Sequence, residues 1–208
     1  DLGYLPDTLV NYLALLGWNP GNDDEIFDFN YLQENFSLDK VNKKSAVFDS
    51  TKLEWVSSQN IFKISAAKLV DIVSEFDPTW CGEGHSLDYL VNVINVIKDR
   101  IKTLSDIKQN SFYFFKHPIE YDEVAIKKCW VESTNDILNS FQEELSHLDD
   151  WNSSNIDELI DKCVNAINIG KGKLMQPLRI ALTGALKGPS IPDLITLLGK
   201  ETCLIRIK

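Results

Sequence analysis

Apolar residues recur along most of the chain at the three- and four-residue spacing that gathers one face of a helix. The longest stripe follows Ser86, a residue type suited to cap a helix N-terminus, and comprises Leu87, Leu90, Val91, Ile94, Ile97, Ile101 and Leu104. It predicts one continuous helix of about five turns. Shorter stripes predict further helices over residues 6–17, 29–36, 50–56, 65–76 and 191–198, two between 121 and 148, and one ending near 167.

One short run does not follow this spacing. Residues 111–115 read SFYFF and end before His117-Pro118, so they fit either a buried strand or a packed turn. The chain shows neither alternation of strand and helix patterns nor an internal repeat of fixed period. We therefore predict a mainly α fold, a multi-helix bundle.

The strongest punctuation lies between residues 77 and 84, where Asp77-Pro78 is followed by Gly82 and Gly84. It predicts a helical domain over residues 1–78 and a second helical domain over 79–208. The second domain allows a further division into subdomains 79–150 and 151–208.

Composition fits an ordinary globular protein, with 44% hydrophobic and 25% charged residues in a chain of 208. No window approaches the roughly 18 to 20 apolar residues of a membrane span, and the start lacks the pattern of a signal peptide. Four dispersed cysteines, none in a CxxC pair, argue against a disulfide framework or a zinc ribbon. We expect a soluble, cytoplasmic monomer that makes no membrane contact.

Charge is distributed unevenly. The formal net charge is -10, which argues against a nonspecific nucleic-acid coat. Residues 162–187 nevertheless contain no Asp or Glu and five basic residues, namely Lys162, Lys171, Lys173, Arg179 and Lys187. Because distant acids are screened over about 8 to 10 Å, such a patch can bind a polyanion. Roughly five neutralised phosphates would give a log-log salt slope near -3.5 to -4.5.

Sequence motifs for other chemistry are incomplete. The run 170–173, GKGK, lacks the spacing of a Walker loop and reads better as a basic connector. Cys81 and His85 have no further ligand nearby, and no histidine lies in the setting of a catalytic triad. We predict no catalytic residue and no metal site.

Two blocks of sequence carry a resemblance to a known family. Residues 174–184 read LMQPLRIALTG and are followed by Gly188-Pro189 and by LLGK at 197–200, which resembles the terminal signature of bacterial glutamyl-tRNA synthetases. Residues 3–7 and 9–18, GYLPD and LVNYLALLGW, resemble the segment that follows the KMSKS loop in that family. The resemblance spans nearly the whole chain.

The resemblance implies the anticodon-binding domain of a class I synthetase, preceded by a part that contacts the tRNA stem. Arg179, Gly188 and Ile191 would contact the first two anticodon bases, and Arg100 the third. Gly188 replaces a hydroxyl residue common in the family, which leaves backbone groups and the apolar surface of Ile191. Lys187, Lys171 and Lys173 are predicted as further RNA contacts from the basic run alone and not from the resemblance.

From the residues alone, other interpretations remain open. Arg179 could pair with an acid, and Arg100 could be a solvated helix arginine. The chain as a whole could be a free-standing helical adaptor that binds proteins through an apolar groove, or the tail of a related synthetase of different amino-acid specificity.

The family joins glutamate to tRNA(Glu) with ATP and magnesium. Neither a HIGH tetrapeptide nor a KMSKS-like loop occurs in this sequence, which starts just after the place of the second. We therefore expect the parent protein to be a glutamate–tRNA ligase and this chain alone to be inactive, with no cofactor of its own and with tRNA(Glu) as its partner.

Overall fold

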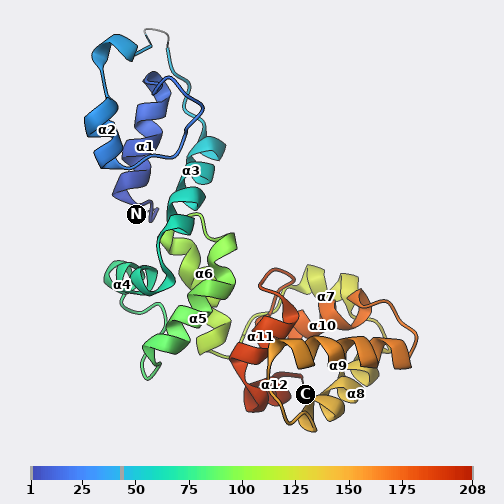
Figure 1. Ribbon diagram of the computed structural model, residues 1–208. Helices are drawn as coiled ribbons and strands as arrows, with labels where there is room; N and C mark the ends of the chain where they lie inside the picture. The colour runs from blue at the N-terminus through green and yellow to red at the C-terminus, as the bar shows by residue number, and fades with distance from the viewer. Residues whose placement is uncertain (1, 43–44, 208) are drawn as a thin grey trace. The chain divides into compact units, whose positions relative to one another are not determined.

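The computed structural model describes residues 2–42 and 45–207, and these residues form twelve α-helices and two short 3-10 turns (Figure 1). They contain no β-strand, only an isolated antiparallel bridge between Trp18 and Val41. The mainly α prediction is therefore confirmed. The helices are α1 (Pro6–Gly17), α2 (Phe29–Asn35), α3 (Ser50–Lys63), α4 (Ala66–Phe76), α5 (Leu87–Ile97), α6 (Leu104–Phe115), α7 (Glu123–Cys129), α8 (Thr134–Ser146), α9 (Ser153–Ala166), α10 (Gly172–Thr183), α11 (Ile191–Leu198) and α12 (Lys200–Ile207).

The chain divides into two compact units, Asp1–Asn110 and Ser111–Lys208. Helix α6 begins in the first unit and ends in the second. The predicted boundary between residues 78 and 79 falls in the loop between α4 and α5, inside the first unit. That boundary, and the division at residue 150, stay predictions.

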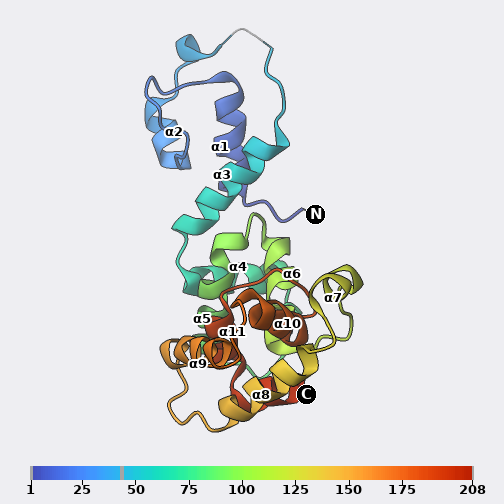
Figure 2. The ribbon, with the colours of Figure 1, turned by 90° about the vertical axis from the view of Figure 1, so that its right-hand side faces the viewer.

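In the first unit, α1 packs between two neighbours (Figures 1 and 2). Tyr12 meets Leu53 and Val56 of α3 in one apolar cluster. The other side of α1 adjoins α2, and just beyond its end Trp18 packs with Phe27 and Leu32 in a second cluster. A side-chain cap fixes the start of α2, because the carboxylate of Asp28 accepts a hydrogen bond from the Tyr31 amide at 2.8 Å.

The prediction of one continuous five-turn helix after Ser86 is wrong. Helix α5 ends at Ile97, a 3-10 turn called η2 (Lys98–Arg100) follows, and Ile101 is extended before α6 begins. The carboxylate of Asp106 accepts the amides of Lys102 at 2.8 Å and Thr103 at 2.9 Å, so it caps a new helix there. Apolar residues on both sides of the break stay buried, which is why their spacing did not reveal it.

The aromatic run 111–115 is neither strand nor turn. It forms the last turns of α6, with Tyr113 and Phe114 buried and Phe112 exposed. One side of the helix end therefore enters the core of the second unit. In that unit α10 lies centrally, packed against α7, α8, α11 and α12.

Candidate nucleic-acid interface

Arg179 lies on α10 among side chains that fix the helix in the core. Leu178 and Ile180 on either side of it are fully buried, whereas Arg179 itself is half-buried. Its guanidinium Nη1 donates a hydrogen bond to the carbonyl of Pro189. The arginine therefore borders the loop 184–190 that joins α10 to α11, with part of its side chain accessible.

The start of this loop is held tightly. Gly184 ends α10 with a φ of 83°, and a Cβ built on it would lie 2.6 Å from the carbonyl oxygen of Glu120. The amide of Asp122 donates to the Gly184 carbonyl at 2.8 Å. A side chain at position 184 would force this contact apart, so only glycine fits here.

Gly188 lies against the guanidinium. Its φ is 155°, and a Cβ built on it would lie 3.0 Å from Nη1 of Arg179. The structure thus brings Arg179 and Gly188 together, as the resemblance implied. The missing side chain at 188 leaves the space in which the guanidinium lies.

Ile191 is placed differently from the expectation. It is the first residue of α11, and its side chain is 0% exposed. It shares the buried face of that helix with Leu194, Ile195 and Leu198, which explains its burial. The expected apolar surface is therefore not available to a base, and only backbone groups near the start of α11 remain at this position.

The predicted basic run carries less free charge than the sequence indicated. Lys162 pairs with Glu144 at 2.7 Å, and Lys171 pairs with Asp157 at 2.9 Å and Asp161 at 2.7 Å. Hydrogen bonds to Asp161 and Asp157 raise the pKa of Lys171 above its usual value. These carboxylates offset both lysine charges locally.

Lys173, at the start of α10, and Lys187, in the loop, are exposed. Neither makes an ion pair with any residue in 2–42 or 45–207. Of the five basic residues in this run, Lys173 and Lys187 are thus the two exposed lysines that no ion pair within the described residues compensates.

Arg100 belongs to the first unit and ends η2, so it does not lie on the predicted long helix. Its guanidinium pairs with the neighbouring carboxylate of Asp99, and its side chain is 37% exposed. A guanidinium in that state can still offer a face to a ligand, although its charge is partly compensated.

Sequence reasoning missed Arg206. Its Nη1 donates to the carbonyls of Tyr113 at 2.7 Å and Leu182 at 2.9 Å, and its Nη2 donates to that of Lys116 at 3.1 Å. These carbonyls belong to the C-terminal ends of α6 and α10, where helical partners are lacking. The signal in the sequence was the spacing, because Cys203, Arg206 and Ile207 fall on one face of α12 and all three are buried.

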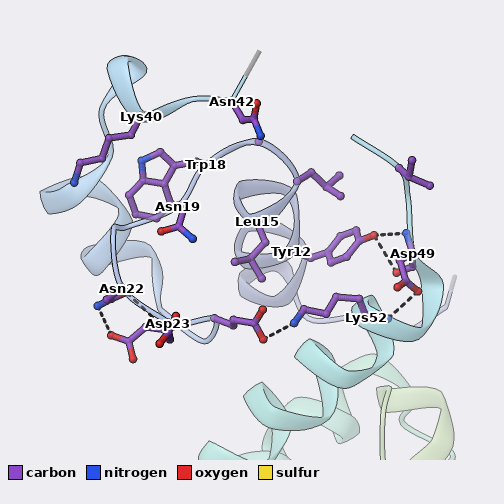
Figure 3. Close-up of a pocket in the computed structure, with 15 residues that line it drawn as sticks. Tyr12, Leu15, Trp18, Asn19, Asn22, Asp23, Lys40, Asn42, Asp49 and Lys52 are labelled. Carbon is purple, nitrogen blue, oxygen red and sulfur yellow. Dashed lines mark hydrogen bonds and ion pairs between the residues drawn. The ribbon is translucent and has the colours of Figure 1, made fainter. Parts of the chain in front are cut away.

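A cavity of about 600 Å³ opens in the first unit between α1, the following loop and the start of α3 (Figure 3). Its polar groups largely satisfy one another. The Tyr12 hydroxyl donates to the Asp49 carbonyl at 2.9 Å and accepts the Asp49 amide at 2.7 Å, and Lys52 pairs with Glu25. We assign no ligand to this cavity.

The part of the chain that the structure describes holds no cluster of three or more His, Cys, Asp or Glu side chains able to bind a metal ion. Among the same residues, no helix has the length and apolar character needed to cross a bilayer.

Two families match the chain. The anticodon binding domain matches residues 66–208, and the catalytic domain of class I tRNA synthetases (E and Q) matches residues 1–55. The first match covers the whole of the second unit, which contains Arg179. The second is confined to a segment that includes α1 and α2.

Individual relatives of the chain come from the same group of enzymes. The glutamate–tRNA ligase of Chloroherpeton thalassium is 39% identical over 217 residues, which cover 99% of this chain and 43% of that protein. Glutamate–tRNA ligase 2 of Thermoanaerobacter pseudethanolicus is 35% identical over 211 residues, covering 100% of this chain and 44% of that protein. The chain therefore spans less than half the length of these relatives.

Solved structures show the same likeness. A glutamate tRNA ligase from Elizabethkingia meningosepticum, crystallised with its amino acid, matches with a TM-score of 0.88 and 33% identity over 99% of this chain and 40% of that one. The glutamate-tRNA synthetase of Elizabethkingia anophelis matches with a TM-score of 0.83. Nothing in the comparisons supports the adaptor alternative. The chain belongs to the glutamate–tRNA ligase family of class I synthetases, and residues 66–208 are its anticodon-binding domain.

Proposed function

We propose that the second unit binds the anticodon loop of tRNA(Glu) and that Arg179 is its central contact. The observation that carries this proposal is the half-buried guanidinium beside the side-chain-free position 188, flanked by the exposed Lys173 and Lys187. A planar guanidinium can stack on an unstacked base and donate two hydrogen bonds at the same time. The two lysines supply sequence-independent attraction for phosphates.

The other predicted residues contribute to RNA binding to different extents, because their surroundings differ. Ile191 takes part through its backbone, together with Gly188, because its side chain is in the core. Lys171 contributes weakly, since two carboxylates already pair with it. In the first unit, Arg100 inspects the third anticodon base, and the N-terminal part contacts the inner elbow of the tRNA.

The decisive measurement is the affinity for a hairpin transcript of the anticodon arm. Arg179→Ala should lower the affinity about 5- to 150-fold, because a base stack is worth about 1 to 3 kcal/mol. Lys162→Ala is the matched control, since it removes the same charge from the same stretch of sequence at a site already paired with Glu144. Equal affinities of Arg179→Ala and the unmodified chain would refute the assignment.

The parent protein, in this proposal, is a cytoplasmic, monomeric ligase that joins glutamate to tRNA(Glu) with ATP and magnesium. The described residues offer no metal cluster, so we derive no step through magnesium on this chain. The chain alone should neither activate glutamate nor charge tRNA. An ATP–pyrophosphate exchange assay of the isolated chain should show no turnover, and turnover would contradict this part of the proposal.

Specificity for glutamate over glutamine tRNA rests on Arg100. Titrations with transcripts of both tRNAs test it, because Arg100→Ala should narrow the difference between their affinities. If the ratio of the two tRNA affinities stays unchanged, Arg100 does not determine specificity, and the role proposed for Arg179 is unaffected.

A further inference from the structure

Tyr113, in the aromatic run 111–115 at the end of α6, is held firmly in the core of the second unit. Its side chain is 3% exposed, and its ring contacts those of Phe112 and Phe114 at centroid distances of 5.4 and 4.8 Å. Its carbonyl accepts a hydrogen bond from Arg206 Nη1 at 2.7 Å. Because backbone and ring are both held in a close-packed interior, the position of the hydroxyl is fixed as well.

This hydroxyl lies beside Gly188 in the loop between α10 and α11. A Cβ built on Gly188 would lie 3.6 Å from the Tyr113 hydroxyl oxygen, an ordinary contact distance, and 3.0 Å from Arg179 Nη1. The phenol oxygen and the guanidinium therefore border the same space, which the missing side chain of residue 188 leaves open.

Arg206 ties Tyr113 to the start of this loop. The same Nη1 that binds the Tyr113 carbonyl also donates to the carbonyl of Leu182, at 2.9 Å, in the last turn of α10. The next residue, Thr183, accepts the amide of Ala185 with its hydroxyl at 3.3 Å. The end of α6, the end of α10 and the first residues of the loop thus form one hydrogen-bonded frame around position 188.

We propose that Tyr113 is a positioning residue for base recognition. Its buried hydroxyl sets how deep Gly188 lies, and thereby the direction in which Arg179 presents its guanidinium to RNA. The phenol itself does not touch RNA, because its side chain is in the core. A hydroxyl oxygen can accept a hydrogen bond and a phenyl C–H cannot, so the polar atom beside Nη1 is the part of Tyr113 that matters. This inference rests on the proposed function, since it requires Arg179 to contact RNA.

Tyr113→Phe tests the role of the hydroxyl, because it keeps the ring and its packing. The Kd for the anticodon-arm hairpin should rise about 3- to 10-fold, the effect of losing one polar contact. Tyr121→Phe is the matched control, since it removes the hydroxyl of the only other tyrosine in the second unit and should leave the Kd unchanged. Titrations are made at a temperature at which circular dichroism shows every variant to be folded, so a general loss of stability does not enter the Kd.

A double-mutant cycle with Arg179→Ala separates positioning from packing. In the Arg179→Ala background, Tyr113→Phe should change the Kd by less than about twofold, because no guanidinium remains to be directed. A purely structural role of Tyr113 would instead raise the Kd by the same factor in both backgrounds.

Three results would overturn the proposal. If Tyr113→Phe leaves the Kd unchanged while Arg179→Ala raises it, Tyr113 does not position Arg179, and the proposed function stands. If Tyr113→Phe raises the Kd equally in both backgrounds, the hydroxyl serves only the packing of the unit. If Arg179→Ala itself leaves the Kd unchanged, the proposed function fails, and the role of Tyr113 fails with it.

Discussion

The guanidinium of Arg179 donates a hydrogen bond to the carbonyl of Pro189, ten residues further along the chain. This bond closes the loop between α10 and α11 with the same side chain that we propose for base recognition. A residue already held in place loses less conformational freedom on binding than one that must be ordered by the ligand. The predictions below test this arrangement and the structure that supports it.

Gly188→Ala should weaken RNA binding. Its Cβ would come within 3.0 Å of Arg179 Nη1 and would impose a backbone conformation that costs about 1 to 3 kcal/mol for other residues. The guanidinium then moves, and we expect the Kd for the anticodon-arm hairpin to rise about fivefold or more, equivalent to about 1 kcal/mol. A fluorescence titration of a labelled hairpin measures this Kd for both proteins.

The control for backbone strain alone is Gly199→Ala. Gly199 has a φ of 79°, yet a Cβ there meets nothing within 4 Å. This variant should lose stability without losing affinity. A comparable rise in Kd for both variants would indicate that loop strain, and not the position of Arg179, governs binding.

Salt dependence should be shallower than the sequence indicated. With Lys162 and Lys171 paired to carboxylates, the exposed Lys173 and Lys187 remain, and two neutralised phosphates give a log-log slope of about -1.4 to -1.8. Hairpin affinities measured at several salt concentrations provide the slope. A value near -4 would show that RNA displaces the carboxylates from both lysines.

Arg206→Met should destabilise the second unit strongly. It would leave the buried carbonyls of Tyr113, Leu182 and Lys116 without their donor, and each such loss costs about 1 to 3 kcal/mol. We expect a decrease of about 3 kcal/mol or more in the free energy of unfolding, measured by urea denaturation. Arg206→Lys keeps the charge but not the forked geometry, so it should retain only part of the stability. A loss below about 1 kcal/mol for the methionine variant would contradict this role.

Acid should remove a contribution made by Asp77. The hydrogen bond from Lys108, together with those from Thr79, lowers the pKa of Asp77 from 3.8 to about 2. Because the folded-state pKa is depressed, the stabilisation is present above about pH 4 and is lost as the pH falls towards 2. Asp77→Asn should therefore have a lower Tm than the unmodified chain at pH 6, with the two values converging near pH 2. A difference independent of pH would argue against the ion pair.

Helix content could be predicted because amphipathic spacing is local. Ser86 was correctly predicted as a cap, because its hydroxyl accepts the Tyr89 amide at 3.3 Å at the start of α5. The break after Ile97 could not be seen, because Ile97, Ile101 and Leu104 are all buried and so keep the spacing of an uninterrupted helix. The cap that produces it, Asp106, is an ordinary polar residue in sequence.

For the candidate site, the motif predicted that Arg179 and Gly188 act together, and the structure places Gly188 beside the Arg179 guanidinium. Their contact with RNA stays a prediction. The extent to which carboxylates compensate the basic run could not be predicted from composition. The carboxylates that pair with Lys171 come from α9, ten or more residues earlier in the chain. Burial of Ile191 likewise depends on how α11 packs, which a motif does not specify.

Arg206 has a consequence for biosynthesis. It reaches back 93 residues to Tyr113, so the end of α6 acquires its donor only after nearly all of the second unit has been translated. Until Arg206 emerges from the ribosome, α6 and α10 cannot be joined at their C-terminal ends. We expect this unit to fold after its synthesis is nearly complete, and its nascent form to depend on protection from aggregation in the meantime.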